Sequence, residues 1–152
     1  MEYIIIIAAV CALEIFLRRM ANQKLELNEK KELPGYPISL NRHHNYGMAE
    51  NRMEERPALV KAIGIAVMAL LVAVFAATLP LRGKKGLKIG LALVMGGGLA
   101  NLAERFLHGY VTDYFQLKVP CRRIRRLIFN AADFCIFIGG VLMLFSELRK
   151  QD

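Results

Sequence analysis

Two aspartates, Asp113 and Asp133, have the types and spacing best suited to chemistry in this sequence. Asp113 comes just after one apolar segment, and Asp133 lies inside the start of the next. Because two membrane segments joined by one short connection emerge on the same side of the layer, we predict that both carboxylates lie at one membrane face and can meet. An aspartate within a membrane span costs several kcal/mol and usually has a function.

Two neighbouring carboxylates can share one proton. Like charges about 3 Å apart do not both ionise easily, so the pKa of one carboxyl rises and that of the other falls. The ionised carboxylate can then activate a water molecule as general base, while the protonated one polarises a peptide carbonyl and later donates to the leaving amine. This chemistry hydrolyses a peptide with no metal, no cofactor and no covalent intermediate.

Two other interpretations of the pair stay open on spacing alone. In a structural interpretation, Asp113 caps a turn or pairs with an arginine of the connection, and Asp133 pairs with Arg105. In a second functional interpretation, the chain is a transporter whose carboxylates carry protons. Four spans without an evident internal repeat disfavour the transporter.

The elements that must position these carboxylates follow from the blocks of apolar residues. The chain has 152 residues, of which 55% are hydrophobic and 21 are Lys or Arg, and the charges fall between the apolar blocks. That pattern is typical of a polytopic membrane protein. We therefore predict a single all-α membrane domain over residues 1–152, with four transmembrane helices and a small extracytoplasmic cap in which Ile38 to Leu40 could form a short strand. The predicted spans are about 3–17, 58–79, 87–107 and 128–147, and the predicted extracytoplasmic connections are 18–57 and 108–127.

The first apolar block contains one carboxylate, Glu14. A cleaved signal peptide is disfavoured because the chain opens with Met1-Glu2 and has no basic start. We expect a transmembrane helix in which Glu14 reaches the interface; held deeper, it would be a functional candidate.

Several polar residues should accompany the aspartates. Asn101 and Arg105 are four residues apart on one face of the third span, which we expect Gly109 to end. Asn130 is three residues before Asp133 and should share its face, with Asp133 roughly 9 Å along the axis of the fourth span. Asn130, and Asn45 from the first connection, could hydrogen-bond an aspartate or the substrate.

No metal or cofactor is expected. The adjacent His43 and His44 point in different directions and have no third ligand nearby, so a solvated or headgroup-facing role is favoured. The three cysteines fit neither a disulfide framework nor a zinc site. We attribute the net charge of +8 to membrane phospholipid and topology rather than to nucleic acid.

At these residues the sequence resembles the lipoprotein signal peptidases, or signal peptidase II, which are four-span aspartic peptidases of the bacterial inner or plasma membrane. The family's glycine-rich run and Asn-x-x-Asp-Arg motif correspond to residues 96–105, and Gly-x-Val-x-Asp-(Phe/Tyr) to residues 109–114. Phe-Asn-x-Ala-Asp reads as residues 129–133, and Asn-x-Gly-x-Ala as residues 45–49. The resemblance covers nearly the whole chain.

The resemblance implies a peptidase that removes the signal peptide from diacylglyceryl-modified prolipoproteins by cleaving before the lipobox cysteine. It implies a multi-pass protein of the bacterial cell membrane with both termini cytoplasmic and residues 18–57 cradling the substrate. We expect a monomer. By the same resemblance Asp113 and Asp133 are the catalytic dyad, and Asn45, Gly47, Asn101, Arg105 and Asn130 line or brace the site.

The charge distribution conflicts with that orientation. The two long connections carry thirteen Lys and Arg, whereas the turn at 82–88 and the C-terminus carry six. Such a count would place the connections in the cytoplasm. The arginines of the second connection could instead hold anionic lipid headgroups; they are Arg122, Arg123, Arg125 and Arg126.

Three departures from the family pattern bear on function. The first motif, Asp-x-x-(Thr/Ser)-Lys, is present only as the stretch from Glu14 to Arg18, in which the charges are kept and the hydroxyl is lost. Glu104 replaces Asp, and Glu50 replaces an aromatic residue. They leave open the lipid and signal-peptide preference, and they leave the alternative of a diverged, non-hydrolytic paralogue that binds lipid-anchored segments. A small proton-coupled carrier is a separate alternative from another class.

Overall fold

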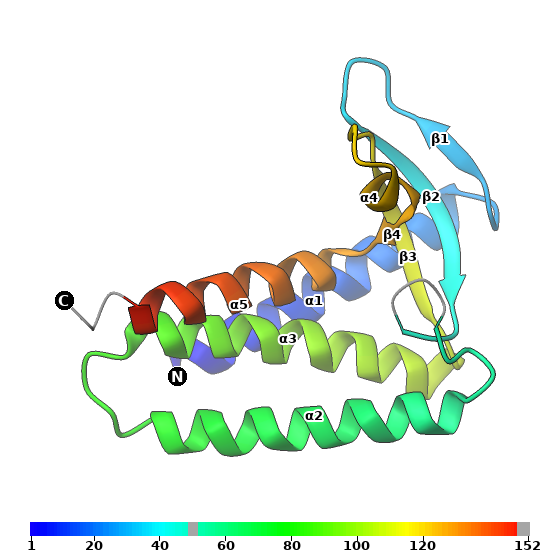
Figure 1. Ribbon diagram of the computed structural model, residues 1–152. Coiled ribbons are helices and arrows are strands. Elements are labelled where there is room, and N and C mark those ends of the chain that lie inside the picture. Colours follow the sequence, from blue (N-terminus) through cyan, green and yellow to red (C-terminus); the bar gives the residue numbers. More distant parts are fainter. Residues whose placement is uncertain (49–51, 149–152) are drawn as a thin grey trace.

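The computed structural model describes residues 1–48 and 52–148, so Ala49 and Glu50 of the sequence motifs lie outside the described residues. Four long helices run side by side, and an antiparallel sheet stands across one end of the bundle (Figure 1). In chain order the elements are α1 (Glu2–Lys24), β1 (Lys30–Glu32), β2 (Ile38–Asn45), α2 (Pro57–Thr78), α3 (Lys85–His108), β3 (Val111–Leu117), α4 (Arg122–Arg126), β4 (Ile128–Phe129) and α5 (Ala131–Leu148).

Among the described helices, three are long and apolar enough to cross a membrane. They are α2, α3 and α5, with 22, 24 and 18 residues and mean hydropathies of 2.6, 1.4 and 1.8 in their most apolar stretches. At about 1.5 Å per residue, α2 is long enough for a hydrocarbon core of about 30 Å. α1 is as long as these helices but includes Glu14 and three basic residues in its second half. The span predicted at residues 3–17 therefore does not follow from length and composition alone.

The central helix is α3, which packs against α1, α2 and α5. Its glycine run allows close approaches to these neighbours. A Cβ atom at Gly97 would lie only 2.6 Å from the carbonyl oxygen of Ala132, so only glycine lets the first turn of α5 pack this tightly. The adjacent Gly96 and Gly98 face α1 and α2 respectively. Three successive residues of α3 thus face three different helices, and one of these contacts sets the position of Asp133.

The cap is a four-stranded antiparallel sheet with the order β1-β2-β3-β4. As predicted, α3 ends at Gly109, whose left-handed backbone (φ 85°) reverses the chain into β3. In the register of β2 with β3, His43 lies opposite Asp113. β4 pairs with the other edge of β3, with Phe129 opposite Phe115. This pairing places the start of α5 close to Asp113.

Several sequence-based boundaries need correction. The chain is mostly helical, but the cap contains a real sheet, and the short strand expected at residues 38–40 extends through Asn45. The first helix continues beyond residue 17 to Lys24 because its last turns pack beneath the sheet, where Ala21 is buried against Tyr114. The segment 128–147 is not one helix from its start, because residues 128–129 pair with β3. Asp133 is therefore the third residue of α5, at its very start.

Candidate active site

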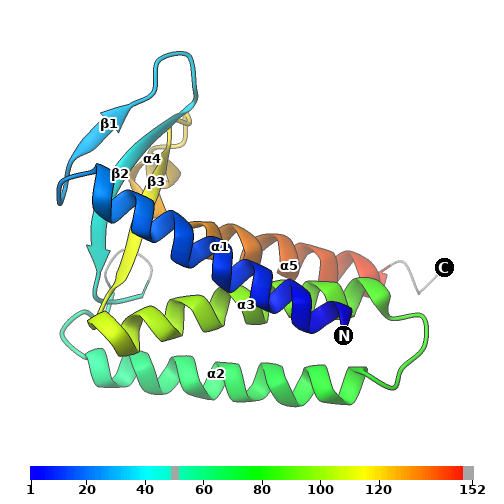
Figure 2. The same cartoon turned by 180° about the vertical axis from the view of Figure 1, so that it is seen from behind.

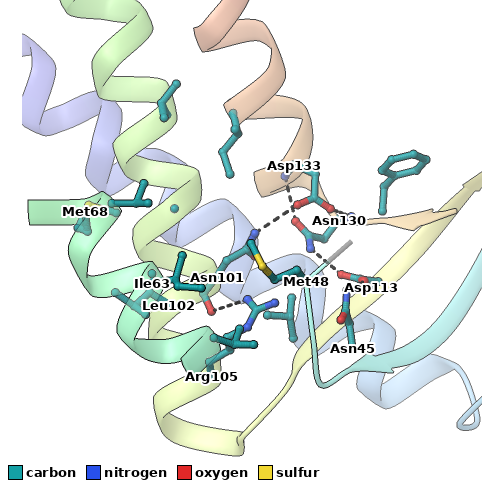
Figure 3. A pocket seen from close by; sticks show the side chains of 18 of the residues that line it. Asn45, Met48, Ile63, Met68, Asn101, Leu102, Arg105, Asp113, Asn130 and Asp133 are labelled. Atoms are coloured by element: carbon teal, nitrogen blue, oxygen red, sulfur yellow. Dashed lines mark hydrogen bonds between the residues drawn. The ribbon is translucent and has the colours of Figure 1, made fainter. Parts of the chain in front are cut away.

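The structure brings Asp113 and Asp133 into one cavity of about 430 Å³ (Figure 3). Asp113 comes from β3, and Asp133 comes from the first turn of α5. The cavity lies where the sheet meets the helix bundle, and residues of β2, α2, α3 and β4 complete its walls. The sequence prediction that the two carboxylates meet at one end of the bundle agrees with this arrangement.

Asn130 links the two carboxyl groups. Its side-chain Nδ2 donates to Asp113 Oδ1 at 2.7 Å, and its backbone N–H donates to Asp133 Oδ2 at 3.0 Å. Its Oδ1 in turn accepts the backbone N–H of Asp133 at 3.0 Å. Asn130 is 1% exposed, so it holds both acids from within the protein. It occupies the junction of β4 and α5, which is why one residue can reach both aspartates.

The remaining carboxyl oxygen of each aspartate accepts a hydrogen bond from another asparagine side chain (Figure 3). Asn45 Nδ2 donates to Asp113 Oδ2 at 3.1 Å, and Asn101 Nδ2 donates to Asp133 Oδ1 at 3.2 Å. Together with Asn130 these residues surround the pair with neutral donors. Neither aspartate forms an ion pair within residues 1–48 and 52–148, so the direct partners of the carboxyl oxygens are amide groups.

Burial and the neighbouring charge change the acidity of Asp113. Asp113 is 3% exposed. Loss of solvation, followed by the negative charge of Asp133, raises the pKa of Asp113 to about 7, although hydrogen bonds from Asn130 and Asn45 oppose the rise. This raised pKa allows the pair to keep one proton near neutral pH, as the shared-proton chemistry requires.

Arg105 and Gly47 support the site from the side of β2. The Arg105 guanidinium donates to the carbonyl oxygens of Gly47 and Asn101, and it does not pair with Asp133. The Gly47 N–H donates to Asn45 Oδ1 at 3.1 Å, which turns the Asn45 amide nitrogen toward Asp113. Both residues thus hold neighbours of the aspartates in place.

The expectation that Glu14 reaches the interface is wrong. Glu14 is 1% exposed, and its carboxylate accepts hydrogen bonds from the Tyr114 hydroxyl at 3.1 Å and from the Ala132 N–H at 2.8 Å. Its side of α1 faces α3, α5 and the sheet rather than lipid. One sequence feature could have indicated this burial. Glu14 and Arg18 have opposite charges and are four residues apart at the end of an apolar block, so they share one helix face.

Glu104, the second departure from the family pattern, lies outside the lining of the cavity. Its Oε1 accepts from the Thr112 hydroxyl at 3.1 Å, and its Oε2 lies 3.5 Å from Arg18 Nη1. The longer side chain therefore connects α3 to β3 and α1.

The two histidines lie on β2, where the His44 ring stacks on Tyr110 with centroids 3.7 Å apart. In the described ranges, no group of three His, Cys, Asp or Glu side chains is placed to hold a metal ion. Cys11, Cys121 and Cys135 are free thiols.

Beyond the aspartates the cavity becomes an apolar groove between α2 and α3. Its walls carry aliphatic and thioether side chains, and its polar groups gather at the aspartate end (Figure 3). A ligand with an amide bond next to a long apolar portion fits this division. The apolar lining includes Met48, Val60, Ile63, Val67, Met68, Leu71 and Leu102.

Comparisons with known proteins agree with the sequence resemblance. A family model described as signal peptidase (SPase) II matches residues 6–149. The chain is 32% identical over 149 residues to a lipoprotein signal peptidase of Mesorhizobium japonicum, covering 96% of this chain and 84% of that one. It is 33% identical over 156 residues to a lipoprotein signal peptidase of Brevibacillus brevis, covering 99% of each.

Two solved structures, each described as a bacterial membrane enzyme, have the same fold. One superposes with a TM-score of 0.84 at 20% identity over 99% of this chain and 90% of that chain. The other has a TM-score of 0.81 at 21% identity over 97% and 92%.

Proposed function

The chain belongs to the signal peptidase II family, and from this premise we propose that Asp113 and Asp133 are its catalytic dyad. The protein is a membrane aspartic endopeptidase of bacterial lipoprotein processing. Its substrate is a diacylglyceryl-modified prolipoprotein, which it cleaves before the lipobox cysteine. The observation that carries the assignment of the dyad is the bonding of both carboxyl groups to Asn130 within one cavity.

We assign the roles of the pair from the raised pKa of Asp113. Asp113 holds the shared proton and hydrogen-bonds the scissile carbonyl, while ionised Asp133 removes a proton from the attacking water. The carbonyl oxygen takes the Asp113 proton as the tetrahedral intermediate forms. When the C–N bond breaks, the leaving amine takes the proton held on Asp133, and the carbonyl reforms and returns a proton to Asp113. Water is consumed, and the dyad recovers its single proton.

The apolar groove supports a substrate that carries acyl chains. The side chains of α2 and α3 offer hydrocarbon contact directly beside the aspartates. We place the diacylglyceryl group along the α2 wall, where Met68 and Ile63 line the groove, and the scissile peptide at Asp113 and Asp133. Burial of acyl chains there would supply most of the binding free energy.

The orientation in the membrane is part of the same proposal. We take α1 as a fourth span despite its charges, since Glu14 and Arg18 face protein and not lipid. α1 crosses α3 and α5 obliquely and packs more extensively against α3 than against α5 (Figure 2). The start of α1 and the end of α5 lie opposite the sheet, which fits cytoplasmic termini and an extracytoplasmic cap formed by residues 18–57 and 108–127. Residues 1–152 then act as one domain and as a monomer.

The basic helix α4 is proposed to contact anionic phospholipid. It lies at the sheet end of the bundle, its four arginines are exposed, and none of them pairs with a carboxylate among the described residues. Each cation at a membrane surface attracts anionic headgroups by about 1 kcal/mol. This would explain why the connection is basic although it is extracytoplasmic.

Replacing the four α4 arginines with Gln should weaken retention of phosphatidylglycerol roughly tenfold or more, because it removes four headgroup attractions. Native mass spectrometry of protein in micelles of defined phosphatidylglycerol and phosphatidylcholine content measures this retention. Replacing Lys30 and Lys31 of β1 with Gln provides a control elsewhere on the cap. Equal retention by the α4 variant and the wild type would refute the contact.

A gel-shift cleavage assay tests the function. Purified protein in detergent should cut a diacylglyceryl prolipoprotein immediately before its lipobox cysteine, and it should leave the unlipidated precursor intact. Mass spectrometry of both products locates the cut. Binding of the precursor without cleavage would favour the non-hydrolytic paralogue, whereas proton flux across protein-containing liposomes without cleavage would favour the carrier.

A further inference from the structure

A second polar cluster lies directly behind the dyad, and the mechanism above does not use it. Glu14 and Arg18, one turn apart on α1, are only 1% and 4% exposed. Arg18 Nε lies 2.9 Å from Glu14 Oε1, at an angle that makes the contact an ion pair rather than a hydrogen bond. A buried ion pair is a poor source of stability because desolvation offsets its attraction. Its presence here therefore calls for a role in positioning other groups.

Arg18 determines which end of the Asn101 side chain faces Asp133. Its Nη2 donates to Asn101 Oδ1, and its Nη1 donates to the Ala100 carbonyl oxygen at 3.1 Å. The two ends of an amide are similar in size, but a guanidinium can only donate hydrogen bonds and so pairs only with the oxygen end. The amide nitrogen of Asn101 is thereby directed at Asp133 Oδ1, 3.2 Å away.

Glu14 fixes the start of the helix that carries Asp133. The first backbone N–H groups of a helix have no partner within the helix. In α5 the Ala131 N–H donates to the Tyr114 hydroxyl at 3.0 Å, and the Ala132 N–H donates to Glu14 Oε2 at 2.8 Å. The Tyr114 hydroxyl itself donates to Glu14. The carboxylate of Glu14 therefore joins α1, β3 and the first turn of α5 immediately before Asp133.

We propose that Arg18 and Glu14 are positioning residues of the peptidase: Arg18 acts through the amide of Asn101, and Glu14 acts through the first turn of α5. Without Arg18, the Asn101 amide can turn and set its oxygen against an oxygen of Asp133, where two acceptors repel. Without an acceptor at position 14, the first turn of α5 loses the hydrogen bond from the Ala132 N–H to α1. Both changes displace the general base, so both should lower kcat and spare KM. The inference rests on the proposed dyad.

The decisive experiment is a double-mutant cycle on Arg18 and Asn101, measured as kcat and KM for the lipidated precursor. Arg18→Met and Asn101→Ala should each lower kcat about tenfold to about a hundredfold and change KM less than about threefold. If Arg18 acts through Asn101, the double variant should be no slower than the slower single variant. Arg18→Lys, which keeps a cationic donor, should recover most of the rate.

Separate controls distinguish a loss of rate from a loss of folding. Removing one member of a buried ion pair leaves an uncompensated charge, so Arg18→Met could fail to fold. The neutral variant Glu14→Gln/Arg18→Met then replaces it in the cycle, because Gln keeps an acceptor for the Ala132 N–H. For Glu14 itself, Glu14→Gln should retain most of kcat and Glu14→Leu should lose about tenfold or more. Thermal unfolding of each variant reports its stability independently of rate.

Three outcomes would overturn the inference: an unchanged kcat in Arg18→Met, a double-variant loss equal to the product of the single losses, or equal rates for the Gln and Leu variants of Glu14. The proposed dyad fails differently, through full cleavage by Asp133→Asn. An inactive Asp133→Asn with an additive Arg18 and Asn101 cycle would keep the dyad and reject only the positioning role.

Discussion

Asp133→Asn and Asp113→Asn are each expected to lower kcat by roughly 10³-fold or more, because each removes one half of the proton transfer in the hydrolysis. Asparagine has the shape of aspartate but cannot take a proton from water, and it cannot give one to the carbonyl oxygen as a carboxylic acid does. The apolar groove that would bind the acyl chains is unchanged in either variant, so KM should stay within about threefold. The two losses should also fail to multiply in the double variant, since the pair acts as one unit.

Initial rates of gel-shift cleavage under matched detergent conditions measure the effect, and binding of the lipidated precursor is measured in parallel. Glu32→Gln is the matched control, because Glu32 is an exposed carboxylate on β1 that does not line the cavity. It should cleave at the wild-type rate. More than a tenth of wild-type kcat in either Asn variant would exclude that aspartate from the reaction.

The wild-type rate should fall as the pH rises through about 7. Burial and the charge of Asp133 raise the pKa of Asp113 to about 7. The active pair holds one proton, so deprotonation of Asp113 above that pH leaves two anions and no group to polarise the carbonyl. Activity should then decline about tenfold per pH unit on the alkaline side.

Asn130→Ala should move that alkaline limit to higher pH while lowering kcat about tenfold to about a hundredfold. The Asn130 side chain donates to Asp113 and favours its ionised form, so removing this donor raises the pKa of Asp113 further. The lower rate follows because Asp113 and the Asp133 backbone both lose a partner that orients them. Profiles of kcat between about pH 5 and about pH 9 compare the two proteins.

The direction in which the alkaline limit of kcat moves tests whether Asp113 holds the shared proton. A limit that stays in place or moves to lower pH would show that Asp113 does not hold the shared proton. Asn45→Ala removes the other side-chain donor to Asp113 and should shift the limit in the same direction.

Sequence alone determined the family of the protein and predicted which two aspartates come together. Apolar blocks and one short connection predicted a helical membrane protein whose two aspartates meet at one end, because membrane burial and helix periodicity are local properties of one segment. The left-handed Gly109 at the end of α3 was predictable for the same reason. The resemblance of the motifs in residues 45–49 and 96–133 to signal peptidase II predicted the peptidase.

Tertiary structure decided how the site is held. β2 and β3 pair residues that are about seventy positions apart in the chain, and no local pattern encodes that register. The pairing of β4 with β3 shortened the last helix and moved Asp133 to its start. This junction is also what allows Asn130 to reach both acids.

The clearest example of a feature that the sequence did not decide is which face of α1 is buried in the protein. In a helix surrounded by lipid and protein, both faces are apolar, so hydrophobicity does not reveal which face carries a functional charge. Only the packing of α1 against α3 and α5 decided that Glu14 and Arg18 lie inside the protein, one bonded to the helix that carries Asp133 and the other to the amide that contacts it.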